Sequence, residues 1–262
     1  MQSRLTLGLL LVGIIVSVST AFADSSCLNV LAGAQSLAAL AADSNNCLVI
    51  GDKEFFNFQF IPDAQNPSAV TSAGIAVKTT GDGTANNLYG IDFASQLGSL
   101  NNISGSLGSV ASLDYEIKYS VQATGGFLVS DVWQLINGSA ITGPGNTSLN
   151  PSSDITVSEV ATDHAGSGST ANSTVSLNPN VFIEPPAQAG DHLILNVAGV
   201  PTPVVRADIT KDVRIDAGTG DKVTLSLIEQ RFSQVPEPRT YALLLGLGLA
   251  ALLWKKRATA TA

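Results

Sequence analysis

A period-two alternation of apolar and polar residues is the feature that most constrains the fold of this chain. It is clearest in residues 113–122, where apolar or aromatic residues occupy the odd positions and polar residues the even ones: Leu113, Tyr115, Ile117, Tyr119 and Val121 against Asp114, Glu116, Lys118, Ser120 and Gln122. Successive side chains of a β-strand point to opposite faces of its sheet. The pattern therefore predicts a half-buried strand of an antiparallel sheet.

Two neighbouring segments extend this interpretation. Residues 53–60 carry three phenylalanines at alternate positions, which predicts a strand with three rings on one face: Phe56, Phe58 and Phe60. The glycine pair Gly125-Gly126 separates the strand at 113–122 from an apolar segment at 127–136. Two strand-like segments joined by a short glycine-containing link predict a β-hairpin.

The rest of the mature chain continues the same pattern. Only 13% of residues are charged, where about 25% is usual for a soluble domain. Gly, Asn, Asp and Pro cluster between the remaining strand candidates, and no alternation of strands with helices is visible. We therefore expect an all-β fold over residues 24–234, an antiparallel β-sandwich of jelly-roll type. The further candidate strands are residues 69–78, 155–160, 173–177, 192–197, 203–209 and 223–232.

The two cysteines lie near the start of this domain, 20 positions apart. In an exported chain Cys27 and Cys47 predict one disulfide rather than two free thiols, and closing such a loop stabilises by roughly 3 kcal/mol. Apolar residues at helical spacing between them predict a short amphipathic helix over residues 30–42. The disulfide would then hold this helix against the first strand.

The first 23 residues have the organisation of a secretory signal peptide. Arg4 is followed by an apolar run over residues 5–18 and then by Ala21-Phe22-Ala23. Small residues at these two positions before a cleavage site predict cleavage between Ala23 and Asp24. An N-terminal anchor helix is the alternative, but the apolar run is short for a membrane span.

The last 28 residues consist of three consecutive parts. Pro236-Glu237-Pro238 is stiff and non-helical, because proline lacks an amide hydrogen and biases its neighbour toward extended structure. Residues 241–254 are free of charge and are expected to form a single transmembrane helix. At about 21 Å this helix is short for a bilayer, and local thinning can absorb the mismatch. The run Lys255-Lys256-Arg257 supplies the positive charge that stops a chain at the inner face of a membrane.

This combination resembles the PEP-CTERM sorting signal of Gram-negative bacteria, which a membrane-embedded transpeptidase, exosortase, is thought to process. The body also contains sequence segments that resemble segments recurring in PEP-CTERM proteins, at residues 47–58, 210–213 and 226–234. The resemblance implies a sorting signal over residues 235–262, with Pro236, Glu237 and Pro238 as its motif. A permanent single-pass anchor is the alternative. The resemblance to PEP-CTERM proteins also implies a link to polysaccharide-rich matrix and biofilm.

Charge and motif searches exclude several classes of function. The chain carries 13 basic against 21 acidic residues, and five of the basic ones lie in the two terminal segments. An acidic body without a basic stripe argues against nucleic-acid binding. The two histidines, His164 and His192, have no zinc-ligand spacing, and no Gly-x-Ser-x-Gly motif is present. We assign no catalytic residue, no cofactor and no metal.

Two groups of acidic residues are candidate sites. Asp114 and Glu116 share one strand face with Lys118, which indicates a solvated charge ladder rather than a glycosidase pair. Four aspartates gather near the end of the body without the spacing of a calcium loop, so a calcium site stays open: Asp208, Asp212, Asp216 and Asp221.

The expected function follows from the two ends of the chain. We expect a non-enzymatic structural or adhesive protein that is exported through the inner membrane. Its C-terminal helix would anchor it transiently, an exosortase-type enzyme would process it, and it would then reside in the envelope or outside the cell. A secreted carbohydrate-binding module or hydrolase on the same sandwich is the alternative, although Trp133 is the only tryptophan of the body.

Overall fold

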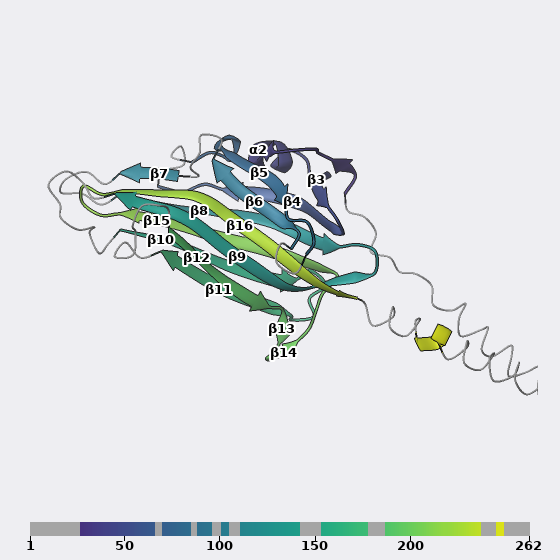
Figure 1. Ribbon diagram of the computed structural model, residues 1–262. Helices are drawn as coiled ribbons and strands as arrows, with labels where there is room; N and C mark the ends of the chain where they lie inside the picture. Colours follow the sequence, from purple (N-terminus) through teal and green to yellow (C-terminus); the bar gives the residue numbers. More distant parts are fainter. Residues whose placement is uncertain are drawn as a thin grey trace, which may run out of the picture.

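The computed structural model describes residues 27–65, 70–84, 88–95, 101–104, 111–141, 153–177, 187–236 and 245–248. The predicted signal peptide and its cleavage site between Ala23 and Asp24 lie outside these residues. The described part of the chain is an all-β sandwich of two sheets, as the alternation predicts (Figure 1). The long strand β16 runs along the sandwich toward the end at which the described body of the chain finishes.

One sheet has nine strands in the order β1-β3-β4-β8-β15-β10-β11-β13-β14. Its neighbours pair in antiparallel fashion except for β1 and β3, which are parallel. The strands are β1 (Asn29–Val30), β3 (Asn46–Ile50), β4 (Lys53–Ile61), β8 (Ala111–Ala123), β15 (Arg206–Ala217), β10 (Asp154–Asp163), β11 (Thr170–Leu177), β13 (Asn196–Val197) and β14 (Val200–Pro201).

The other sheet has seven strands in the order β12-β9-β16-β6-β5-β2, with β7 also paired to β16. Its strands are β12 (Ala187–Ile194), β9 (Phe127–Ile141), β16 (Lys222–Pro236), β6 (Gly90–Ser95), β5 (Ile75–Thr80), β2 (Gln35–Ser36) and β7 (Asn101–Ser104). β16 is central: it pairs with β9 on one side and with β6 and β7 on the other.

The core lies between the two sheets, where the apolar faces of their strands meet. The odd-numbered side chains of residues 113–121 are all buried there, which confirms the alternation predicted for β8. Tyr119 stands at the centre of an aromatic cluster, with ring centroids 5.7 Å from those of both Phe58 and Phe93. Because Phe93 belongs to the opposite sheet, these contacts join the two layers and add to the stabilisation from apolar burial.

The predicted shared face of the three phenylalanines in β4 is wrong at one position. Asn57 adopts a left-handed conformation, with φ of 56°, and the register with β8 shifts between Phe56 and Gln59. This β-bulge reverses the alternation, so that Phe55 and Phe58 both enter the core. Phe56 instead lies under the guanidinium of Arg206, whose Cζ is 4.7 Å from the ring centroid.

The predicted hairpin between residues 113–122 and 127–136 is also wrong. β8 pairs with β4 and β15 in the nine-stranded sheet, whereas β9 pairs with β12 and β16 in the other. Gly125 and Gly126 have φ of 70° and 80°, a region that side-chain-bearing residues rarely adopt. The glycine pair therefore carries the chain from one sheet to the other instead of folding it back.

The predicted helix over residues 30–42 is much shorter in the structure. α2 spans Leu37–Ala41, and Ser36 caps it by accepting a hydrogen bond from the amide of Ala39 at 3.1 Å. The preceding residues form the short strands β1 and β2, separated by Gly33 at a φ of 72°. Strand pairing thus overrides helical spacing here, and the one-turn helix η1 (Ser72–Gly74) likewise delays the strand predicted from residue 69 until Ile75.

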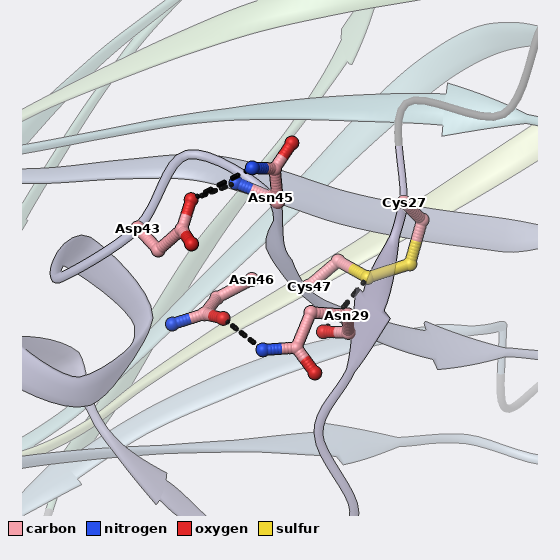
Figure 2. Close-up of a disulfide and its surroundings, with 6 residues drawn as sticks. All are labelled: Cys27, Asn29, Asp43, Asn45, Asn46 and Cys47. Carbon is pink, nitrogen blue, oxygen red and sulfur yellow. Dashed lines mark hydrogen bonds between the residues drawn. A yellow bond between two sulfur atoms is a disulfide. The ribbon is translucent and has the colours of Figure 1, made fainter.

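The expected disulfide joins Cys27 to Cys47, with 5.6 Å between their Cα atoms. Figure 2 shows that it lies at the parallel pair β1–β3, where the side chain of Asn29 donates to Asn46 at 2.5 Å. Two backbone bonds support the same pair, from Asn29 to Asn45 and from Leu31 to Cys47. The bridge therefore fastens the first strand to β3 rather than a helix to a strand.

Candidate functional site

The predicted sorting motif begins inside the sandwich. Pro236 is the last residue of β16 and lies opposite Phe127 of β9, while Val235 lies opposite Leu128. A proline at the end of a strand removes no interior ladder bond. Glu237 and Pro238 lie outside the described residues. The first motif residue is thus continuous with a central strand, and no linker separates the two.

A buried lysine from the opposite sheet holds the residues just before the motif. Lys53 of β4 donates from Nζ to Gln234 Oε1 and, at 2.8 Å, to Asp52 Oδ1. The lysine side chain is fully buried. Burial lowers the pKa of Lys53, and the hydrogen bond and charge of Asp52 offset part of that shift. This contact ties the end of β16 to the nine-stranded sheet.

Aromatic packing holds the same strand two residues before Gln234. Phe232 is buried, and its ring centroid is 5.6 Å from that of Phe55. Between Ser233 and Pro236, the strand ladders of the described residues pair β16 with β9 alone. The segment that leads into the motif is therefore extended, fixed on one edge and clamped from the opposite sheet.

The region predicted to cross the membrane is described only at residues 245–248, which are helical. Leu245 and Leu247 are 68% and 55% exposed, so these two side chains do not pack into the sandwich. Within the part of the chain that the structure describes, no helix is both long enough and apolar enough to span a bilayer. The predicted stop residues Lys255, Lys256 and Arg257 lie outside that part.

The two histidines occupy separate polar contacts. His164 Nδ1 lies 2.7 Å from Asp208 Oδ2, and His192 Nε2 lies 3.0 Å from Asp131 Oδ2. Among the described residues, no group of three or more His, Cys, Asp or Glu side chains is arranged to hold a metal ion. The four aspartates that the sequence offers as calcium ligands do not form one site. Asp216 pairs with Arg214, and Asp221 accepts a hydrogen bond from Ser153.

An acidic groove of about 460 Å³ lies over the nine-stranded sheet, and it includes the carboxylates considered in the sequence. Lys118 contacts Glu116 at 2.9 Å, the arrangement of a charge ladder. Asp212 of β15 lies opposite Glu116 in the ladder register. Burial, a hydrogen bond with Asp114 and the charges of Asp114 and Glu116 raise the pKa of Asp212 to about 6, against a smaller opposite effect of Arg214.

This raised pKa gives a testable pH dependence. The folded chain keeps the Asp212 proton up to about pH 6, whereas an unfolded aspartate loses it near pH 4. Ionised Asp212 therefore destabilises the fold above pH 6, and Asp212→Asn should stabilise at pH 7.5 by up to about 1 kcal/mol, a figure discounted for solvent exposure. The gain should shrink at pH 5. Urea unfolding at both pH values measures it.

The matched control is Asp216→Asn on the same strand. Asp216 forms an ion pair with Arg214 at 2.7 Å, so its loss should not stabilise at either pH. Equal stabilisation by Asp212→Asn at pH 5 and pH 7.5 would contradict the raised pKa of Asp212.

The sequence interpretation missed four buried polar residues: Gln134, Glu159, Lys211 and Gln230. They come from β9, β10, β15 and β16, and they contact one another between the sheets. Each stands at a position whose strand neighbours two residues away are apolar and buried, such as Ile209 and Val213 around Lys211. The signal that could have found them is a polar residue at a strand position where the alternation predicts a buried apolar one.

Comparison with protein-family models identifies residues 234–257 as a PEP-CTERM protein-sorting motif. The chain therefore carries the sorting motif that its C-terminal residues resemble. Such a motif implies processing by an exosortase, and with it secretion and sorting to the envelope or surface. The match starts at Gln234, the residue that Lys53 holds, and includes the predicted stop residues. A comparison with curated proteins finds no matching sequence.

Solved structures similar to the chain include several carbohydrate-binding modules. A TmCBM61 structure in complex with β-1,4-galactotriose is 13% identical over 67% of this chain and 88% of its own, with a TM-score of 0.29. The xylan-binding module CBM15 is 8% identical over 66% and 90%, with a TM-score of 0.26. The K1 cleaved adhesin domain of Lys-gingipain from Porphyromonas gingivalis W83 is 9% identical over 76% and 97%, with a TM-score of 0.30. Similarities with TM-scores this low do not assign a function to the chain.

Proposed function

We propose that this chain is a structural or adhesive protein of the cell envelope or extracellular matrix, delivered by exosortase-type processing of its C-terminal signal. The observation that carries the proposal is the PEP-CTERM motif at residues 234–257, joined without a linker to the central strand β16. In this proposal residues 241–254 anchor the exported chain transiently in the membrane. The sandwich itself has no catalytic role.

The junction supports this order of events. Gln234 is clamped by Lys53, and Pro236 is still paired in the sheet. In this proposal the peptide bonds that a membrane enzyme reaches therefore begin beyond Pro236. Folding of the sandwich would thus place the start of the motif at the end of β16, and processing would release a complete domain.

The experiment compares a host that encodes an exosortase-type enzyme with the same host after deletion of that enzyme. Cell fractions are blotted for the sandwich domain. The proposal expects a shorter, released or surface-located form in the first host and full-length chain in the membrane fraction of the second. Identical size and location in both hosts would contradict it.

A second candidate function is carbohydrate binding on the outer face of the seven-stranded sheet. Trp133 is 44% exposed, and one face of its ring stacks on His192 with centroids 3.8 Å apart. His192 Nε2 in turn lies 3.0 Å from Asp131 Oδ2. A rigid indole next to polar groups can stack on a sugar ring and bond its hydroxyls.

The test is binding of the purified sandwich to the host's own extracellular polysaccharide by co-sedimentation. Trp133→Ala should reduce binding at least about tenfold, which corresponds to about 1.4 kcal/mol. Val160→Ala alters an exposed apolar residue of β10, in the nine-stranded sheet; it is the control and should bind normally. Unchanged binding of Trp133→Ala would remove this face from consideration.

A further inference from the structure

An ion pair lies fully buried between the two sheets. Lys211 of β15 and Glu159 of β10 have no exposed side-chain surface, and Lys211 Nζ lies 2.5 Å from Glu159 Oε2. Gln230 of β16 donates to the other carboxylate oxygen, Oε1, at 3.0 Å. Burying two charges is unfavourable unless hydrogen bonds compensate them.

A third group completes the arrangement. Lys211 Nζ also contacts Gln134 Oε1 of β9 at 2.6 Å, and Gln134 Nε2 donates to the carbonyl of Val157 at 3.0 Å. The second bond fixes which end of the amide faces the lysine. Since a C=O bond is about 1.2 Å long, the amide carbon of Gln134 lies within about 3.8 Å of Nζ. Reacting atoms in productive complexes are about 3–3.5 Å apart.

The surroundings favour the neutral forms of the pair. Burial lowers the pKa of Lys211, and the charge and hydrogen bond of Glu159 offset part of that change. Burial likewise raises the pKa of Glu159, against the opposing effects of Lys211 and Gln230. Transfer of the proton from Lys211 to Glu159 would leave an amine with a free electron pair beside a carboxylic acid. Tyr119 is also buried and stays uncharged, because burial and the charge of Glu159 raise its pKa well above the usual value.

We propose that Lys211 and Gln134 form an intramolecular isopeptide bond across the sandwich, with Glu159 as the proton shuttle. The proposal rests on the placement of an amine, an amide carbon and a carboxyl group in one dry site between β9, β10 and β15. It does not depend on the proposed sorting function.

The reaction balances without any co-reactant. The electron pair of neutral Lys211 Nζ attacks Cδ of Gln134 and forms the new C–N bond. Protonated Glu159 gives its proton to the departing amide nitrogen and takes one proton from the attacking nitrogen. The Cδ–Nε2 bond breaks, ammonia leaves, and Glu159 returns to its starting state. No oxidation or reduction takes place.

The bond would lock the two sheets together. β9 belongs to the seven-stranded sheet and β15 to the nine-stranded sheet, so the link crosses the core. β9 is also the strand that pairs with β16 up to Pro236. A covalent crosslink here would therefore hold β9, the pairing partner of the strand that leads into the motif, to the nine-stranded sheet, independently of the disulfide between Cys27 and Cys47.

The test is mass spectrometry of the protein isolated from its own host. We expect one crosslinked peptide pair that joins Lys211 to Gln134 and is lighter by one ammonia, about 17 Da, than the two peptides together. Trypsin should fail to cleave after Lys211. Glu159→Gln, which keeps the size of the side chain, should give the unmodified mass and separate peptides.

Controls separate this outcome from its rivals. Lys118→Met removes an exposed lysine and should keep the crosslink. Separate, unmodified Lys211 and Gln134 peptides in the wild-type protein would overturn the proposal, without any need for a variant to fold. So would a loss of water between Lys211 and Glu159, or a crosslink that maps instead to the second buried lysine–glutamine contact, Lys53 with Gln234.

Discussion

Replacing Pro236, Glu237 and Pro238 together by alanine should abolish C-terminal processing and leave the exported chain at full length in the membrane fraction. The motif match at residues 234–257 includes all three positions. Alanine removes both the stiffness of the two prolines and the charge between them, while the preceding β16 residues keep their pairing with β9. The measurement is a blot of cell fractions against the wild-type protein.

A control shows that the effect belongs to the motif. Pro201→Ala alters an exposed proline in the short strand β14 and should leave processing unchanged. The triple variant should also unfold at the same temperature as the wild type, because Pro236 ends its strand. Normal processing of the triple variant would remove the motif from the sorting mechanism, whatever its fold.

Gly90→Ala should destabilise the fold strongly, more than alanine at any other glycine whose surroundings the structure describes. A Cβ at Gly90 would lie 1.7 Å from the backbone carbonyl oxygen of Gln230 and 2.8 Å from its carbonyl carbon. These atoms belong to β16 and cannot rotate away, so β6 would have to separate from the central strand. We expect a loss of at least about 3 kcal/mol in the free energy of unfolding, measured with urea.

Gly74→Ala provides the matched control for this result. A Cβ at Gly74 would meet only the Thr71 hydroxyl, at 3.6 Å, which is an ordinary contact. Its stability should stay within about 0.5 kcal/mol of the wild type. A loss below about 1 kcal/mol for Gly90→Ala would mean that β6 and β16 are not held as closely as the structure shows.

Much of the sandwich could be predicted, because strand alternation is a direct consequence of burial on one face. The odd positions of β8 are buried as expected, and β10 and β15 follow the same parity. Departures arise where one residue changes the parity or the sheet. The left-handed Asn57 makes a bulge, and Gly125-Gly126 leads into the opposite sheet. Alternation alone contains no information on either event.

The site divides in the same way. The sorting motif is local in sequence, so its residues could be read directly from the chain. The contact between Lys53 and Gln234 joins positions 181 residues apart, and only the pairing of the sheets brings them together. The buried polar group around Lys211 could have been suspected, because each of its four residues stands at a strand position where the alternation predicts burial. The alternation does not say which of these polar residues contact one another.

The direct connection of β16 to the motif also has a consequence for how the protein is displayed. A flexible linker would let the domain move away from the membrane before processing. Here Gln234 is held by Lys53 and Pro236 is paired with β9, so no flexible segment separates the sandwich from the first residue of the motif. The domain that leaves the enzyme would therefore carry its new C-terminus at one end of the sandwich.

Mass spectrometry of the mature C-terminus tests the central claim most directly. The exported protein is isolated from its host and digested, and its C-terminal peptide is identified. Processing at the motif predicts that this peptide ends in the vicinity of Pro236–Pro238 and that no peptide contains Trp254-Lys255. Recovery of an intact Trp254-Lys255 peptide from the mature protein would show a retained tail, and the account of processing would be wrong.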